Sequence, residues 1–95
     1  MTDLQRFDWD DAKSARNNHE RGFGFDYAAQ IFAGSVVEEE DRRRNYGESR
    51  IVATGEFAGD IFVIVDTWRA GRRRIISARR AKRRERDAYR TAIPE

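Results

Sequence analysis

IFVIVDTWRAGRRRIISARR, residues 61–80, decides the fold, because it predicts two long strands joined by a tight turn. Residues 61–65 are apolar at every position, which is typical of a central strand covered on both faces. Ala70 and Gly71 interrupt the pattern and predict a two-residue hairpin turn. Residues 72–79 follow as the second strand, so an arginine-rich segment is expected inside a folded sheet rather than in a solvated tail.

A two-residue turn at Ala70 and Gly71 would set which residues face each other across the hairpin, and a β-bulge would alter this register. Because side chains alternate between the two faces of a strand, paired residues share a face. One face is expected to carry the pairs Arg69–Arg72, Thr67–Arg74 and Val65–Ile76, and the other the pairs Trp68–Arg73 and Asp66–Ile75. The end of the hairpin should therefore present a cluster of guanidinium groups, whose planar fork suits phosphate. For any single arginine, an ordinary solvent-facing side chain is the alternative.

The rest of the chain predicts one α+β domain over residues 1–95. A short strand or arm is expected at 7–11, and Gly22 should end a helix over 11–21. The further elements expected are a helix over 25–32, strands over 36–41 and 50–56, and a basic helix over 80–92. Short turns between successive strands favour an antiparallel meander with the helices covering one face.

Charge is distributed unevenly along the chain, although the net charge is only +2. Residues 1–70 carry nine basic and fourteen acidic side chains, which gives −5. Residues 71–95 carry ten basic and three acidic side chains, which gives +7. The basic part predicts a polyanionic partner, either nucleic acid or an acidic protein.

Several classes of protein are excluded by what the sequence lacks. With no cysteine there is no disulfide framework, zinc knuckle or thiol nucleophile, which fits a reducing cytoplasm. The longest apolar run, residues 61–65, is too short to cross a membrane, and the first residues hold no apolar run typical of a signal peptide. We therefore expect a cytoplasmic protein without a membrane partner.

Three groups of motifs, in order along nearly the whole chain, resemble the BrnT toxin family. They are Phe7-Asp8-Trp9-Asp10 with Lys13, Asn17, Arg21-Gly22, Phe25, Ala28 and Phe32; Asp41-Arg42 with Tyr46-Gly47-Glu48 and Arg50; and Thr67 and Arg69 with Arg74-Ile75-Ile76-Ser77-Ala78-Arg79-Arg80-Ala81, Glu85-Arg86 and Tyr89. Two positions depart from the family pattern. Glu20-Arg21-Gly22 stands where relatives often have Lys-His-Gly, and Asp66 stands where they often have tyrosine.

The resemblance implies the toxin of a bacterial type II toxin–antitoxin pair. Members of this family are small ribonucleases similar in fold to the RelE toxins, and they inhibit translation by cleaving RNA. The cognate antitoxin, a BrnA-like protein, carries a DNA-binding module, and the complex represses its own promoter. The resemblance thus implies RNA and this antitoxin as partners, in a homodimer or a toxin–antitoxin hetero-oligomer.

Cleavage of RNA without a metal needs a base for the 2′-hydroxyl, stabilisation of the extra negative charge at phosphorus, and a proton for the leaving 5′-oxygen. Arginine meets the second need but is a poor base, because its pKa lies above about 12. We predict catalytic roles for Arg69, Arg74, Arg79, Lys13 and Asp66, RNA binding by Arg72, Arg80, Tyr46 and Lys82, and neither a metal nor a cofactor. The candidates for proton transfer are Asp66, Glu48, His19, Lys13 and Tyr46.

Other interpretations remain for three features. The carboxylates at 38–41 could hold Mg²⁺, but a solvated acidic edge is favoured because consecutive strand residues point to alternate faces. Trp68 is expected to pack rather than to stack on RNA. The basic segment could also bind nucleic acid or an acidic antitoxin without cleaving anything. An antitoxin that masks it should place acidic side chains near Arg74, Arg79 and Arg80, and apolar ones near an exposed aromatic.

Overall fold

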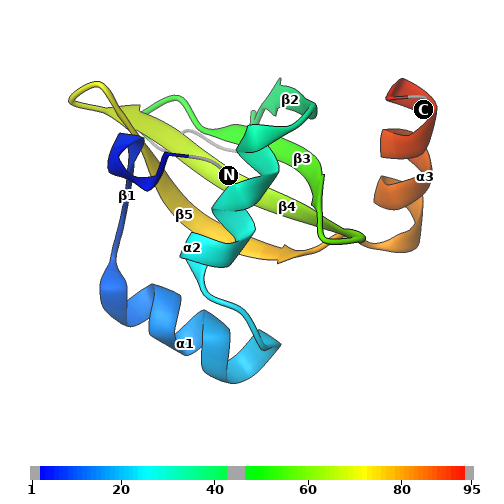
Figure 1. Ribbon diagram of the computed structural model, residues 1–95. Helices are drawn as coiled ribbons and strands as arrows, with labels where there is room; N and C mark the ends of the chain where they lie inside the picture. Colours follow the sequence, from blue (N-terminus) through cyan, green and yellow to red (C-terminus); the bar gives the residue numbers. More distant parts are fainter. Residues whose placement is uncertain (1–2, 43–46, 94–95) are drawn as a thin grey trace.

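The structure is a computed structural model that describes residues 3–42 and 47–93, and its elements follow the expected α+β order (Figure 1). The strands are β1 (Phe7–Trp9), β2 (Val36–Glu40), β3 (Ile51–Phe57), β4 (Asp60–Arg69) and β5 (Arg72–Arg80). The helices are α1 (Asp11–Arg21), α2 (Phe25–Ala28) and α3 (Arg83–Ala92), with 3₁₀ turns η1 (Leu4–Arg6) and η2 (Ala29–Ala33). The strand boundaries shift by one or two residues from the predicted ones, and two helices change more: the helix over 25–32 divides into α2 and η2, and the last helix begins at Arg83 because β5 extends to Arg80.

Within the described residues, five strands form one mixed sheet in the order β1-β5-β4-β3-β2. The strands from β2 to β5 are the predicted antiparallel meander. β1, whose pairing the sequence did not predict, pairs in parallel with β5, with Phe7 opposite Arg73 and Trp9 opposite Ile75. Parallel neighbours need a long crossover, and most of the chain lies between these two strands. The predicted meander therefore gains a parallel strand at this edge, and the sheet is mixed.

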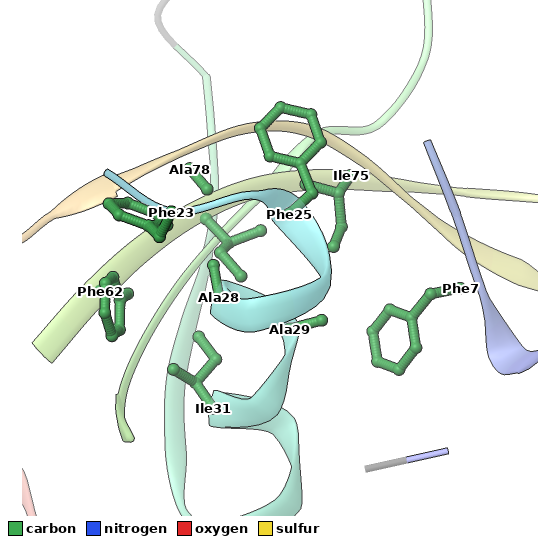
Figure 2. Close-up of a cluster of buried hydrophobic side chains, with 10 residues drawn as sticks. Phe7, Phe23, Phe25, Ala28, Ala29, Ile31, Phe62, Ile75 and Ala78 are labelled. Carbon is green, nitrogen blue, oxygen red and sulfur yellow. The ribbon is translucent and has the colours of Figure 1, made fainter. Parts of the chain in front are cut away.

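The main hydrophobic core lies on the face of the sheet covered by α2 and η2, which we call the core face (Figure 2). Phe25 and Ile31 pack from this helical layer against Phe62 of β4 and Ile75 of β5. A glycine in β3 permits the close approach, since a Cβ at Gly55 would lie 2.8 Å from the Cβ of Ile31. The helical layer can therefore lie directly on the strands that carry the arginines on their other side.

α1 lies beside α2 along the outer edge of β5 (Figure 1). It begins where the Asp10 carboxylate accepts a hydrogen bond from the Lys13 backbone N–H, and it ends at Gly22, whose φ is 85°. The Arg21 guanidinium donates to Ala78 O at 2.7 Å, at the part of the β5 edge that β1 does not reach. The predicted limits of this helix, 11–21, are confirmed.

α3 packs on the opposite face of the sheet, so the expectation that the helices cover one face was wrong. Its Tyr89 packs against Ile61 and Val63 of β4, and the Tyr89 hydroxyl donates to Ser35 O at 2.8 Å. The residues of β4 with odd numbers share this face, because side chains alternate along a strand. The rest of this face carries arginines, and we call it the arginine face; its members are Arg69 of β4 and Arg72, Arg74 and Arg79 of β5.

The β4–β5 hairpin has the predicted pairing at its turn end. The confirmed pairs are Arg69–Arg72, Trp68–Arg73, Thr67–Arg74 and Asp66–Ile75. The prediction fails at the next step, because Val65 pairs with Ser77 and leaves Ile76 as the extra residue of a β-bulge. Without a bulge, Arg74 and Arg79 would lie on opposite faces, since they are an odd number of residues apart. The bulge thus brings Arg79 onto the arginine face and sends Arg80 to the core face.

Both hairpin turns of the described sheet use an Ala-Gly pair. Ala58 and Ala70 each have a φ of 53°, and Gly59 and Gly71 have φ values of 86° and 76°. Positive φ at both central residues defines a type I′ turn, whose twist matches that of the flanking strands. The turns are therefore tight and well matched to the sheet, although alanine is strained in this conformation.

Candidate functional site

Glu48 forms an acidic centre on the arginine face, in the segment that leads into β3. Its Oε1 accepts a hydrogen bond from Arg69 Nη2 at 3.1 Å, and its Oε2 accepts one from Arg50 Nε at 3.4 Å. The Thr67 hydroxyl donates to Ser49 O at 2.7 Å and ties this segment to β4. A carboxylate that remains 29% exposed is thereby fixed between two guanidinium groups.

β1 supplies the acceptors for the next two arginines. Arg74 Nη1 donates to Asp8 Oδ2 at 2.6 Å, and this hydrogen bond holds the pKa of Asp8 below its usual value. Arg72 Nη2 donates to Phe7 O at 2.6 Å. Arg72 is therefore oriented by a neutral carbonyl, and among the described residues it forms no ion pair, although its charge also acts on Asp8.

Arg79 lies further along the same face, beside α3. The pairs Thr67–Arg74 and Val63–Arg79 are separated by four residues of β4, which is about 13 Å at roughly 3.3 Å per residue. The Arg79 guanidinium makes a two-pronged ion pair with Glu85, at 2.7 and 2.8 Å, and this contact lowers the pKa of Glu85 to about 2. Glu85 also accepts the Lys82 backbone N–H at 2.7 Å, so the start of α3 holds Arg79 in place.

Asp66, a predicted catalytic residue, lies on the core face and does not meet the arginine face. Its side chain is 0% exposed, and its Oδ1 and Oδ2 accept hydrogen bonds from Arg73 Nη1 at 3.2 and 3.3 Å. Burial raises the pKa of Asp66 to about 6 against the opposing attraction of Arg73. The Arg73 guanidinium also donates to Glu38 Oε1 at 2.9 Å and lies 4.1 Å from the Phe32 ring and 4.7 Å from the Trp68 ring.

The other predicted site residues are dispersed. The Arg80 guanidinium lies on the core face, 5.0 Å from the Phe23 ring, and donates to Arg21 O at 2.9 Å. Lys82 is exposed at the start of α3. Lys13 is exposed on α1, which lies along the outer edge of β5. Tyr46 lies outside the described residues.

The structure therefore groups only part of the predicted site. Arg69, Arg72 and Arg74 share the turn end of the arginine face, and Arg79 joins them through the bulge. Lys13, Asp66 and Arg80 are not part of this group. Glu48 was predicted only as one of several candidates for proton transfer, and its signal in the sequence was the Tyr46-Gly47-Glu48 motif followed by Arg50.

Two further properties of the described chain bear on the kind of site. Among residues 3–42 and 47–93, no three histidine, aspartate or glutamate side chains are grouped so that they could hold a metal ion. Glu38 and Glu40 belong to the acidic segment 38–41, for which Mg²⁺ binding is the alternative. They form ion pairs with Arg73 and Arg42, respectively. No helix in these two ranges is long and apolar enough to cross a membrane.

Comparison with the models of known protein families identifies a match that covers these residues. The model of the family described as ribonuclease toxin, BrnT, of type II toxin–antitoxin systems matches residues 9–85. The chain belongs to the BrnT family. The matched range contains Glu48, Thr67 and every member of the arginine face, and membership in the BrnT family implies an RNA target and an antitoxin partner. No curated protein matches the chain.

Proposed function

We propose that this BrnT-family chain is an endoribonuclease that cleaves RNA on its arginine face without a metal ion. The observation that carries the proposal is the grouping of Glu48 with Arg69, Arg72 and Arg74 at the end of one rigid hairpin. Arginine donates two parallel hydrogen bonds to phosphate, and a preformed set of such donors stabilises charge that develops in a transition state. The site therefore combines a carboxylate base with cations for the phosphate.

Glu48 takes the role of general base in this proposal, in place of Asp66. A phosphate that binds Arg69 competes with Glu48 for its guanidinium and frees a carboxylate oxygen beside the incoming ribose. Glu48 then accepts the 2′-hydroxyl proton while the 2′-oxygen bonds to phosphorus and the bond to the 5′-oxygen breaks. The leaving oxygen takes its proton from solvent, since the single histidine, His19, lies on α1. The products are a 2′,3′-cyclic phosphate and a 5′-hydroxyl.

Two arginines of the face are assigned to the charge of the transition state. Arg69 contacts Glu48, and Arg74 lies opposite Thr67, whose hydroxyl donates to Ser49 O next to Glu48 in the chain. Arg79 lies about 13 Å away along β4, a distance that suits a neighbouring part of the same RNA strand. Arg72, which donates to Phe7 O, is assigned to backbone binding.

The decisive experiment compares Glu48→Gln with the matched variant Glu39→Gln. Glu39 is an exposed carboxylate of β2 on the same face of the sheet as the arginines. Loss of a general base costs about 10²- to 10⁴-fold in rate, so Glu48→Gln should slow RNA cleavage to that extent and Glu39→Gln should not. Equal rates for the two variants, with unchanged thermal unfolding, would exclude Glu48 as the base. Tight RNA binding by the wild type without any cleavage would favour the alternative of a non-catalytic binding module.

Metal independence is tested separately with a chelator. Glu38 and Glu40 form ion pairs with Arg73 and Arg42. The carboxylates of the acidic segment 38–41 are therefore not arranged around one point where a metal ion could bind. We expect EDTA to leave the cleavage rate unchanged. A rate that EDTA abolishes and Mg²⁺ restores would contradict this part of the proposal.

The proposed antitoxin masks the arginine face and places acidic side chains near Arg74 and Arg79. Their present partners, Asp8 and Glu85, show that carboxylates fit these guanidinium groups. In the proposed complex the antitoxin also carries the DNA-binding module for autorepression, and release of the toxin inhibits translation. Attraction between opposite charges speeds encounter, so added salt should slow association more than it speeds dissociation. An association rate that ignores ionic strength would contradict this surface as the interface.

A further inference from the structure

The tip of the β4–β5 hairpin projects beyond the strands beside it (Figure 1). β3 pairs with β4 only as far as Asp66, and β1 pairs with β5 only as far as Arg73. The pair Arg69–Arg72 therefore has no strand on either side, and the Ala70–Gly71 turn closes it. Because the hairpin ends at this turn, a ligand that passes around the tip can contact side chains of both faces.

Trp68 is exposed at this tip to an extent that packing does not explain. It is 55% exposed, more than any other large hydrophobic residue of the described chain, whereas Trp9 packs against the main core. The expectation that Trp68 packs was therefore wrong for half of its surface. An exposed indole of this size leaves a broad apolar ring open for a ligand.

The orientation of the Trp68 indole is fixed by the side chain of Arg73, which packs against it. The Arg73 guanidinium lies 4.7 Å from the centre of its ring, and Arg73 is itself held by ion pairs with Asp66 and Glu38. The same guanidinium lies 4.1 Å from the centre of the Phe32 ring. A cation held by two carboxylates therefore supports the indole, and less side-chain freedom remains to be lost when a ligand binds.

The charges that flank Trp68 along the tip select the class of ligand. Arg69 follows it in the chain and Arg72 completes the turn, and both are exposed cations. Two carboxylates on the same face as the indole, Glu38 and Asp66, are engaged by Arg73. An aromatic platform flanked by arginines is the arrangement that binds single-stranded nucleic acid, with a base on the ring and phosphates on the guanidinium groups. A surface that binds a protein partner would be expected to carry both acidic and basic side chains around such an aromatic residue.

We propose that Trp68 is a stacking platform for one nucleobase of a single-stranded RNA whose backbone continues onto the arginine face. This inference rests on the proposed ribonuclease function and extends it with a binding subsite around the hairpin tip. Trp68 is assigned to substrate binding and not to the chemical step. Its removal should therefore weaken RNA binding and leave the rate at saturating RNA close to that of the wild type.

The test uses Trp68→Leu, which keeps an apolar side chain without an aromatic face, and Trp68→Phe, which keeps a smaller ring. The probe is a short single-stranded RNA with methylated 2′-hydroxyls, which cannot be cleaved, and a second copy in which base-free sugars replace the nucleotides of one segment. We expect Trp68→Leu to weaken binding of the intact probe roughly tenfold or more, and Trp68→Phe to weaken it less. The base-free probe should bind the wild type and Trp68→Leu equally.

Each outcome decides a separate point. If Trp68→Leu binds and cleaves RNA as the wild type does, the platform is wrong and the ribonuclease proposal stands. If the wild type neither binds nor cleaves RNA, the proposed function fails and the platform fails with it. If Trp68→Leu retains RNA affinity but loses affinity for the antitoxin, Trp68 is a protein anchor and the inference is overturned. Unchanged thermal unfolding of both variants excludes misfolding as the cause.

Discussion

Arg73 and Arg74 are neighbours in one strand, yet they have different surroundings because they point to opposite faces of the sheet. Arg73 is 15% exposed, pairs with the fully buried Asp66, and lies within 5 Å of the Phe32 and Trp68 rings. Arg74 pairs with Asp8, whose side chain is 39% exposed, on the open arginine face. A phosphate can replace Asp8 at little cost, but nothing from solvent can replace Arg73 beside Asp66. Position in the strand, and not residue type, separates the arginine that stabilises the fold from the arginine available to a ligand.

The largest expected effect is on stability, in a comparison of Arg73→Met with Arg74→Met. Both changes keep an apolar stem and remove the charge. Arg73→Met leaves Asp66 buried without its cation, which should lower the free energy of unfolding by roughly 3–5 kcal/mol. Arg74→Met breaks a surface pair and should lower it by about 1 kcal/mol or less. Urea unfolding of the two variants measures the difference. Equal losses in the free energy of unfolding would contradict the distinction between the two faces.

The next effect concerns activity, which should depend on the arginine face and not on the arginines of α3. Arg69→Ala and Arg74→Ala should each slow RNA cleavage roughly a hundredfold or more, because each removes a donor to transition-state charge. Arg79→Ala should slow it less, because Arg79 is assigned to a neighbouring part of the RNA strand. The α3 variants Arg83→Ala and Arg90→Ala should have little effect. Single-turnover cleavage rates test this order. Small and equal losses from all five variants would remove the arginine face as the site.

A smaller effect is the pH dependence of stability, which has opposite signs on the two faces. Burial raises the pKa of Asp66 from 3.8 to about 6, so the folded chain binds this proton more tightly than the unfolded chain does. The stabilisation from Asp66 is therefore complete below about pH 4 and is lost as the pH rises through about 6, by an amount on the order of 2 kcal/mol. On the arginine face the sign is opposite. Glu85, with its pKa lowered from 4.5 to about 2, contributes stability above pH 4.5 that is lost as the pH falls toward 2.

Urea unfolding between pH 4 and pH 7 checks the Asp66 contribution. The difference in the free energy of unfolding between the wild type and Asp66→Asn should shift against the wild type as the pH rises. Glu85→Gln, measured over the same range and below it, should instead lose its disadvantage as the pH falls. A wild-type curve parallel to that of Asp66→Asn would show that Asp66 does not titrate in this window.

The smallest expected effect is at the two Ala-Gly turns. Asparagine tolerates a positive φ better than alanine, so Ala58→Asn and Ala70→Asn should each raise the free energy of unfolding by about 0.5–1 kcal/mol. Thermal unfolding measures this gain. Ala70 lies at the proposed RNA-binding tip and Ala58 does not, so the pair also shows whether stiffening the tip alters RNA affinity. A loss of stability at either site would contradict the turn geometry.

The hairpin could be predicted from the sequence because its turn and the alternation of its residues are local signals. Four cross-strand pairs followed from Ala70 and Gly71 alone. The bulge at Ile76 could not be predicted, since two adjacent isoleucines fit either face. That one residue decides that Arg79 joins Arg74 and that Arg80 does not.

Long-range contacts limited the prediction of the rest of the site. The parallel pairing of β1 with β5 depends on chain segments far apart in sequence, and a three-residue strand carries little signal of its own. Glu48 lies in a segment whose position is set by the hydrogen bond from Thr67 to Ser49 O. Its motif was visible, but its place between Arg50 and Arg69 follows only from the folded chain. Likeness to the RelE toxins stays a prediction.

The pairing of β1 with β5 has a consequence for the timing of synthesis. Asp8 and Phe7 of β1 are hydrogen-bonded to Arg74 and Arg72, which lie 66 and 65 positions later in the chain. Closing so long a loop is slow, and a nascent chain emerges from the ribosome N-terminus first. Until β5 has been translated, the growing polypeptide is an acidic fragment with a net charge of −5 over residues 1–70. A ribosome that stalls before residue 71 therefore releases a product that lacks Arg72, Arg74 and Arg79, so the proposed activity can begin only after β5 has been translated.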